Sequence, residues 1–383
     1  MEKVNTTTIK KLLFLEGLRG LAALYVVIHH ARWFLWEGYS EGYLKHPEEY
    51  SLIGKITVYF LSIFIYGHEM VLFFFLLSGF VIHLRYARNL NKGVINFDFW
   101  PYFIRRFSRI YPPLVFALVF TFLLDSYGKH LGFSIYEGVA PFRIVKDNFS
   151  WITLLGNLAF LMNSYVESWG SDFALWSLKF EWWFYMLYPL FFLIVRKNNS
   201  LAFTSIILLF ITSFFPKLWP LKILQEIFAY MVIWWFGVIL ADIYTGRIKI
   251  KFSYLVPLIV FIPIAIIIKS KTGIPDIYWN FLWGTGWMGI LSLFFCLHEK
   301  NVETKAFNKI QWLGACSYTL YIIHSPILVF ISGYLMKRDG KLPSHFGYVI
   351  AGTSLSILVA WLLHYVIEKP FMGVSISKIR NGK

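Results

Sequence analysis

Charged residues and cysteines are scarce in this sequence of 383 residues. Asp, Glu, Lys and Arg together make up 15% of the chain, whereas hydrophobic residues make up 58%. A soluble domain has about 45–50% apolar residues, so the polar side chains here are too few to cover a water-exposed globule. The two cysteines, Cys296 and Cys316, both lie in apolar surroundings. This placement favours small core residues over a disulfide framework or a metal site.

The chain also lacks internal repeats, low-complexity tracts and a recognisable soluble domain. No cleavable signal peptide is expected, because the first apolar run carries Glu16 and Arg19 and ends in His29-His30. Acidic residues number 21 against 36 basic ones, which gives a net charge of +15. In a membrane protein such an excess is typical of cytoplasmic loops, so we expect no nucleic-acid partner.

Long apolar runs near 20 residues fill most of the chain, and runs of this length are typical of membrane spans. Many Trp and Tyr residues lie at their ends, where amphipathic rings favour the headgroup level. We therefore predict an all-α, polytopic transmembrane helical bundle with about ten spans. Residues 56–66 either extend the second span or lie in the interface, and 151–163 are interpreted as re-entrant or interfacial. The predicted spans are 13–36, 69–84, 110–125, 174–195, 201–216, 224–244, 253–268, 277–297, 310–336 and 346–367.

The distribution of Lys and Arg predicts the orientation of the bundle. Ten crossings with the N-terminus inside place 21 of these residues in cytoplasmic segments, 12 outside and 3 within spans. An eleventh crossing at 151–163 would reverse this bias, which is why we reject it. We expect both termini in the cytoplasm, with a cytoplasmic segment at 1–12, a membrane domain at 13–371 and a cytoplasmic tail at 372–383.

Arg19 and His30 lie in the first span, and an ionisable residue inside a span is costly enough to suggest a function. The two are eleven residues apart, so they project within about 20° of each other, separated by about 16 Å along the helix axis. Gly17 and Gly20 leave room beside Arg19 for a neighbouring helix or a ligand. The alternative is structural: Arg19 neutralises Glu16, and His30 bonds a backbone carbonyl.

Glu181 lies in the fourth predicted span, about seven residues below its outer end, and His30 lies about six residues below the same surface. We expect the two at similar depth, where a carboxylate would fix the tautomer of an imidazole and support its action as a general base. Alternatively, Glu181 pairs with Lys179 or with Arg32.

Arg105, Arg106 and Arg109 are predicted in the second cytoplasmic loop, just before Pro112-Pro113. Guanidinium groups at a cytoplasmic helix start suit a polyphosphate, because they bind phosphate bidentately. Taken alone, however, this cluster is better explained by anchoring against anionic lipid.

Ser317, Tyr321 and His324 fall at i, i+4 and i+7 in the ninth predicted span and form one polar stripe on an apolar helix. Pro326 is expected to bend this helix. We expect the stripe to face the bundle interior, although a transporter would show the same feature.

Together these segments resemble the acyltransferase-3 family of membrane O-acyltransferases, which includes O-antigen and exopolysaccharide acetylases. The resemblance covers residues 13–371, and its motifs occur in the family's order. Glu16 is a departure, since the family commonly has aspartate there, and we expect a small effect. The motifs are LEGLRGLAALYVVIHH with the Arg-x10-His pair, VLFFFLLSGFVI with Ser78-Gly79, RRFSRIYP with the Arg-x-x-Arg pair, WSLKFEWWFYMLYP with Glu181, SYTLYIIHSPI, and HYVIEKPF with Glu368 and Pro370.

The resemblance implies transfer of an acyl group, expected to be acetyl, from cytoplasmic acyl-CoA to a hydroxyl of a cell-surface glycan or its lipid-linked precursor. It implies a bacterial inner membrane and a stand-alone form without a fused esterase-like domain. Membrane lipids, acyl-CoA and the glycan are the expected partners, with no permanently bound cofactor and no metal. The expected site residues are His30 and Glu181 for catalysis, Arg19, Arg106 and Arg109 for acyl-CoA binding, and Ser78, Ser317, Tyr321 and His324 along the substrate pathway.

Two other classes of protein compete with this interpretation. A secondary transporter or flippase using intramembrane charges would be expected to show internal repeats or paired broken helices, and the sequence shows neither. A membrane receptor or scaffold would leave Arg19, His30 and Glu181 without a purpose. Binding of acyl-CoA discriminates among the three classes, since neither alternative needs it.

Overall fold

The computed structural model describes residues 12–137, 145, 148–269, 276–300, 302, 307 and 309–371. Within these ranges the chain is helical, with one isolated bridge between Met162 and Val166 as the exception to an all-α architecture. In chain order the helices are α1 (Leu13–Phe34), α2 (Leu52–Ser62), α3 (Gly67–Asn91), α4 (Phe99–His130), α5 (Trp151–Leu158), α6 (Trp176–Val195), α7 (Asn199–Thr212), α8 (Lys222–Tyr244), α9 (Phe261–Lys269), α10 (Asp276–Glu299), α12 (Gln311–Ala315), α13 (Ser317–Asp339) and α14 (Gly347–Ile367).

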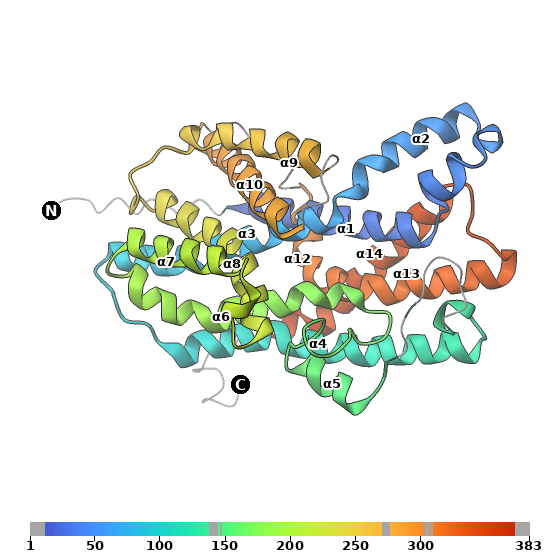
Figure 1. Ribbon diagram of the computed structural model, residues 1–383, viewed down its shortest axis with the longest axis horizontal. Coiled ribbons are helices and arrows are strands. Elements are labelled where there is room, and N and C mark those ends of the chain that lie inside the picture. The colour runs from blue at the N-terminus through green and yellow to red at the C-terminus, as the bar shows by residue number, and fades with distance from the viewer. Residues whose placement is uncertain are drawn as a thin grey trace.

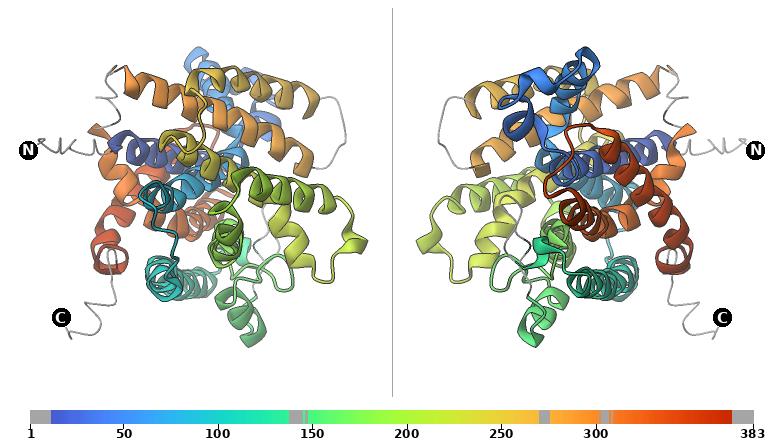
Figure 2. Two further views of the ribbon diagram at one scale, coloured as in Figure 1. Left: turned by 90° about the vertical axis from the view of Figure 1, so that its left-hand side faces the viewer. Right: turned by 90° about the vertical axis from the view of Figure 1, so that its right-hand side faces the viewer.

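The helices pack into one elongated bundle, drawn with its long axis horizontal in Figure 1. The long helix α4 runs along one side of the bundle and is seen nearly end-on in the right-hand view of Figure 2. The expected terminal segments, 1–12 and 372–383, lie outside the described residues except for Leu12. Their cytoplasmic location therefore stays a prediction.

Nine helical segments in the described part of the chain are long and apolar enough to cross a membrane. Each overlaps one predicted span, so the predicted all-α membrane bundle is confirmed. The remaining predicted span, 201–216, forms α7, which has 14 residues and is therefore about 21 Å long. This is shorter than the roughly 30 Å hydrocarbon core of a bilayer. Nine of the ten predicted spans therefore correspond to helical segments that are long enough to cross a bilayer.

The two ambiguous segments both form separate short helices. α2 ends at Ser62, and the chain leaves regular helical geometry at Phe64 before α3 begins. α2 has 11 residues and α5 has 8, so neither is long enough to span a bilayer. Each presents large apolar side chains on the surface, as Ile53 does on α2 and Trp151 on α5.

Helix α4 begins earlier than predicted, at Phe99 instead of residue 110. Pro101 lies in its first turn, where a missing N–H costs no hydrogen bond. The helix then continues through Pro112 and Pro113, which membrane helices tolerate when neighbouring helices satisfy the freed carbonyl groups. The prediction that Arg105–Arg109 lie in a loop is therefore wrong, because these arginines are held on a helix.

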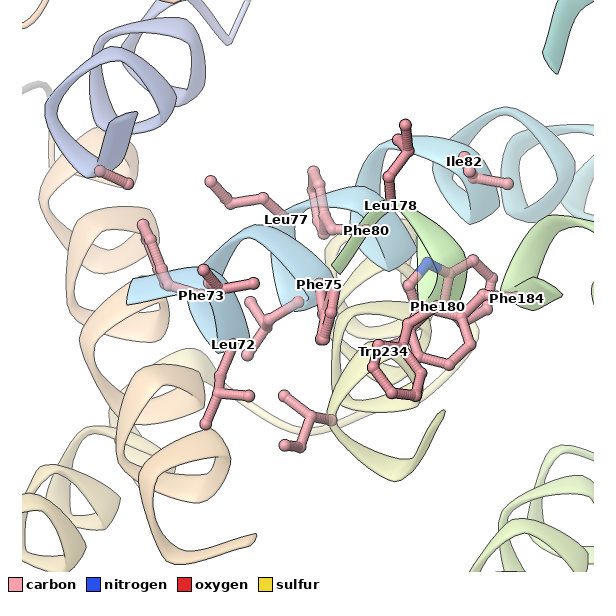
Figure 3. Packing of buried hydrophobic residues seen from close by; sticks show 14 of the residues in the cluster. Leu72, Phe73, Phe75, Leu77, Phe80, Ile82, Leu178, Phe180, Phe184 and Trp234 are labelled. Carbon is pink, nitrogen blue, oxygen red and sulfur yellow. The ribbon is translucent and has the colours of Figure 1, made fainter. Parts of the chain in front are cut away.

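The centre of the bundle depends on a close approach of α3 and α8. Gly79 lies directly against the backbone of Trp234, and Gly237 lies against the carbonyl oxygen of Leu76. Small residues allow two membrane helices to approach to backbone contact, and here they hold α3 directly against α8. Figure 3 shows the rings packed around this contact: Phe75 of α3, Phe180 and Phe184 of α6, and Trp234 of α8.

Candidate active site

Within the described residues, a cavity lies between α1, α3, α4, α6 and α13. Its volume is about 860 Å³, counting the space at its open mouth. Every predicted site residue except His30 and His324 lines this space. The charged lining residues are Glu16, Arg19, Arg106, Arg109 and Glu181, and the hydroxyl-bearing ones are Ser78, Ser177, Tyr185, Ser317, Tyr318 and Tyr321.

Arg19 is fixed at the cavity wall by several partners. Its Nη2 group lies 2.8 Å from Oε2 of Glu16 and donates to the carbonyl oxygen of Gly314 at 2.9 Å, while its Nε donates to Ser317 Oγ at 3.1 Å. The pairing with Glu16 thus forms, as the structural alternative expected. The room beside Gly20 is taken by α12, whose Gly314 backbone lies directly against it. Arg19 is nevertheless 17% exposed and faces the cavity.

Arg106 and Arg109 are one turn apart on α4 and both face the same cavity. The guanidinium of Arg106 lies over the rings of Tyr185 and Tyr102, 5.5 Å and 5.9 Å from their centroids. Its Nε is buried without a hydrogen-bond partner among the described residues. Arg109 lies within electrostatic range of Glu181. Lipid anchoring alone does not account for arginines that point into the bundle.

Glu181 faces the cavity from α6, on the side opposite to Lys179. It accepts a hydrogen bond from the Tyr185 hydroxyl and a longer one, 3.5 Å, from Ser78 Oγ. Lys179 pairs instead with Glu226, at 2.7 Å. The alternative in which Glu181 neutralises Lys179 is therefore not what the structure contains, and the carboxylate is directed toward the arginines of the cavity.

His30 lies beyond the cavity lining, and its partner is a second histidine. Its Nδ1 lies 2.8 Å from Nε2 of His324, and the two rings meet edge to edge, nearly parallel, with centroids 5.0 Å apart. The expected pair between His30 and Glu181 is absent from the described contacts. The depth argument compared positions along the membrane normal, but it could not say that the two side chains turn toward different helices. His29 projects elsewhere, with Nδ1 2.8 Å from the carbonyl oxygen of Phe64.

The polar stripe of α13 connects the cavity with the histidine pair. All three of its members are buried. Ser317 lies beside Arg19, Tyr321 shares a 2.7 Å hydrogen bond with Ser177 of α6, and the Tyr321 ring lies 5.8 Å from that of His324. The stripe thus faces the bundle interior and runs from the arginine end of α1 to its histidine end.

Several residues of this site did not stand out in the sequence. Tyr185 and Tyr318 line the cavity, and each follows a residue that was recognised, Tyr185 one turn after Glu181 and Tyr318 directly after Ser317. Helical spacing could have indicated Tyr185. Glu368, which was noted only as part of a motif, accepts a hydrogen bond from Thr319 at 2.9 Å and is buried near the start of α13.

A second buried network lies away from the cavity. His83 of α3 lies 2.7 Å from the Tyr188 hydroxyl and 2.9 Å from Asp242, which pairs with Arg247 at 2.7 Å. His83 and Asp242 are ionisable residues within predicted spans, so the rule that singled out Arg19 would also have indicated them.

Among the described residues, no group of three His, Cys, Asp or Glu side chains has the geometry to hold a metal ion.

Comparison with known proteins identifies the class. A model of the acyltransferase-3 family, which describes an acyltransferase domain, matches residues 12–365, so the chain belongs to this family. The chain is similar to the acyltransferase MdmB of Streptomyces mycarofaciens, with 28% identity over 214 residues, 53% of this chain and 47% of that protein. It is also 31% identical over 109 residues to protein 2 in the picA locus of Rhizobium radiobacter, which covers 28% of this chain and 43% of that protein.

The matched segments span less than half the length of each of these curated relatives. No solved structure matches the chain. The acyl transfer itself, its donor, its acceptor and the residues that act on them are therefore matters for proposal.

Proposed function

We propose that the protein transfers an acyl group, acetyl in the first instance, from cytoplasmic acyl-CoA to a hydroxyl group of a cell-surface glycan or its lipid-linked precursor. One observation carries the proposal: a cavity with three arginines leads, along the polar stripe of α13, to a hydrogen-bonded pair of histidines, of which His324 is buried and His30 half-buried. The membrane would be a bacterial inner membrane, with both termini in the cytoplasm.

The arginine end of the cavity suits the donor. Phosphate groups prefer guanidinium partners, which bind them bidentately, and within the described part of the chain the buried Nε of Arg106 has no hydrogen-bond partner. Arg19 and Arg109 complete a cationic wall in which Glu16 and Glu181 limit the net charge. The 3′,5′-nucleotide end of CoA would lie here, and its thioester arm would extend along Ser317 and Tyr321.

The histidine end suits the acceptor. A sugar hydroxyl is a poor nucleophile at neutral pH, and a positioned imidazole typically accelerates such a reaction by about 10²–10⁴-fold by taking its proton in the transition state. We assign this role to His30. Glu181, which lies among the arginines and not beside His30, is assigned instead to shaping the donor end of the cavity through Tyr185 and Ser78.

The test measures product formation by purified protein in liposomes, with radiolabelled acetyl-CoA and a glycan fraction from cells that lack the gene. His30→Ala should lower transfer by about 10²–10⁴-fold while acetyl-CoA binding is retained. His29→Ala is the comparison variant. Its ring touches the His30 ring edge-on, but its Nδ1 bonds the Phe64 carbonyl and takes no part in the hydrogen bond with His324, so the variant should be much milder. Near-normal turnover of the His30 variant, or greater damage from the His29 variant, would show that the catalytic assignment is wrong.

The acceptor is identified separately. Mass spectrometry of surface glycans from cells with and without the gene should show one added mass, which names the acyl group, on one carrier, which names the acceptor. An unchanged glycan profile would direct the search to other hydroxyl compounds.

A further inference from the structure

The pair formed by His30 and His324 has a defined direction of hydrogen bonding. His324 is completely buried, and its Nδ1 lies 3.1 Å from the carbonyl oxygen of Leu320, one turn earlier on α13. Its Nε2 lies 2.8 Å from Nδ1 of His30. Three groups from two helices are thus joined in a row, in the order Leu320 carbonyl, His324 ring, His30 ring.

The chemistry of these groups decides which nitrogen carries each proton. A carbonyl oxygen can only accept, so His324 Nδ1 must be the donor. In a neutral imidazole the other nitrogen is then an acceptor, so His324 Nε2 presents a lone pair to His30. The proton in the 2.8 Å contact therefore belongs to His30 Nδ1. A neutral His30 in this arrangement carries its free lone pair on Nε2.

That lone pair is placed for contact with a ligand. The ring-nitrogen contacts described for His30 involve Nδ1, and the residue is partly exposed. Phe173 packs edge-on against the His30 ring at 5.0 Å between centroids, while the His324 ring meets it edge to edge through the hydrogen bond. The His29 ring lies at 5.0 Å as well, so three neighbours hold the His30 ring in one orientation, in which Nε2 remains free to accept a proton.

We propose that His324 is a positioning residue, which holds His30 in the Nδ1-protonated tautomer and so presents Nε2 as the base. This inference rests on the proposed function and gives His324 a more specific role than lining a substrate pathway. In the step, the acceptor O–H proton moves to His30 Nε2 as the oxygen bonds to the acyl carbon. The carbon–sulfur bond of the thioester then breaks, and the proton passes to the leaving sulfur to give CoA-SH.

His324 also supports the charged intermediate state. When His30 gains the proton it becomes an imidazolium, and its Nδ1–H then donates to an uncharged ring nitrogen at 2.8 Å. Hydrogen bonds with one ionised partner are roughly twice as strong as neutral ones, so the contact strengthens as the reaction proceeds. The Leu320 carbonyl, at the far end of the row, orients the His324 ring for this role.

The test compares His324→Gln with His324→Leu. The glutamine amide oxygen reaches the place of the imidazole Nε2 and can accept from His30 Nδ1–H, whereas leucine fills a similar volume and cannot. We expect the leucine variant to lose about 10²-fold or more in kcat, the lower part of what a general base contributes, with the KM for acetyl-CoA little changed. The glutamine variant should recover most of this loss.

His324→Asn provides a second comparison if the leucine variant does not fold, since its amide is polar but too short to reach His30. It should be slower than the glutamine variant. Equal kcat values for the glutamine and the leucine or asparagine variants, or wild-type kcat in the leucine variant, would overturn the inference. A wild-type protein that fails to transfer acetyl groups from acetyl-CoA would instead refute the proposed function, so the two failures are distinguishable.

Discussion

Replacing Arg106 with alanine should weaken donor binding without weakening the fold. The guanidinium lies against two tyrosine rings, but its buried Nε has no hydrogen-bond partner among the described residues. Leaving a buried donor unpaired costs about 1–3 kcal/mol, and the alanine variant removes this cost together with the ring contacts. We therefore expect R106A to keep a melting temperature close to that of the wild type in the absence of ligand.

The loss should appear when the donor is added. A hydrogen bond to a charged group contributes about 1.5–3 kcal/mol, which corresponds to about a 10- to 150-fold increase in the Kd of acetyl-CoA. R106K should recover only part of the affinity, because an ammonium group keeps the charge but lacks the planar fork of guanidinium. The affinities are measured by isothermal titration calorimetry on purified protein in detergent, with CoA itself as a second ligand.

Arg105→Ala is the matched control for this experiment. It removes the same charge from the same turn of α4, but Arg105 interacts with Tyr86 and is not one of the residues that line the cavity. Wild-type affinity in R105A alongside the loss in R106A would support a specific phosphate contact. If both variants lost affinity equally, the arginines would act only as a general positive field, and unchanged affinity in R106A would refute the reasoning.

Two further predictions concern orientation and stability. In intact cells, a membrane-impermeant reagent should label a single cysteine that replaces Ser40 but not one that replaces Lys251, because the distribution of Lys and Arg places Lys251 inside. Labelling at Lys251 would overturn the predicted orientation. Asp242→Ala should lower the unfolding free energy by about 3–5 kcal/mol, because it leaves Arg247 without the partner it holds at 2.7 Å. Asp339→Ala, in an exposed pair, should leave the melting temperature unchanged, and equal melting temperatures for the two variants would contradict a structural role for the buried pair.

The helical bundle could be predicted from the sequence, because apolar runs of about 20 residues are typical of membrane-spanning helices. It also indicated Arg19, since an ionisable residue in a span needs a reason to be there, whereas Arg106 and Arg109 were indicated by the resemblance and not by their place in the chain. The start of α4 was missed because the predicted span covered only the apolar run from residue 110, whereas the helix begins eleven residues earlier, at Phe99, and carries the arginines. α7 is an apolar run whose helix ends early, at Thr212.

The partners of the site residues could not be predicted in the same way. Periodicity gives the face of each helix, but not which face meets which neighbour. His30 and Glu181 were expected to meet because they share a depth, yet His30 faces His324, which is 294 residues further along the chain. Glu181 faces Tyr185 on its own helix. Long-range pairing of this kind depends on how α1, α6 and α13 are rotated about their axes relative to one another, and a single sequence does not indicate these rotations.

The continuity of α1 sets a distance as well as a direction. The helix runs without interruption from Leu13 to Phe34, and Gly20 fixes it against α12. Arg19 and His30 therefore keep a spacing of about 16 Å along the axis. In an acyltransferase that works as proposed, this helix fixes the distance between the phosphate-binding arginines and His30. A donor held by its phosphates can then bring its thioester to His30 only if its arm is long enough to cover that distance. Thioesters on truncated arms should then occupy the arginines without reacting, as competitive inhibitors of the full-length donor.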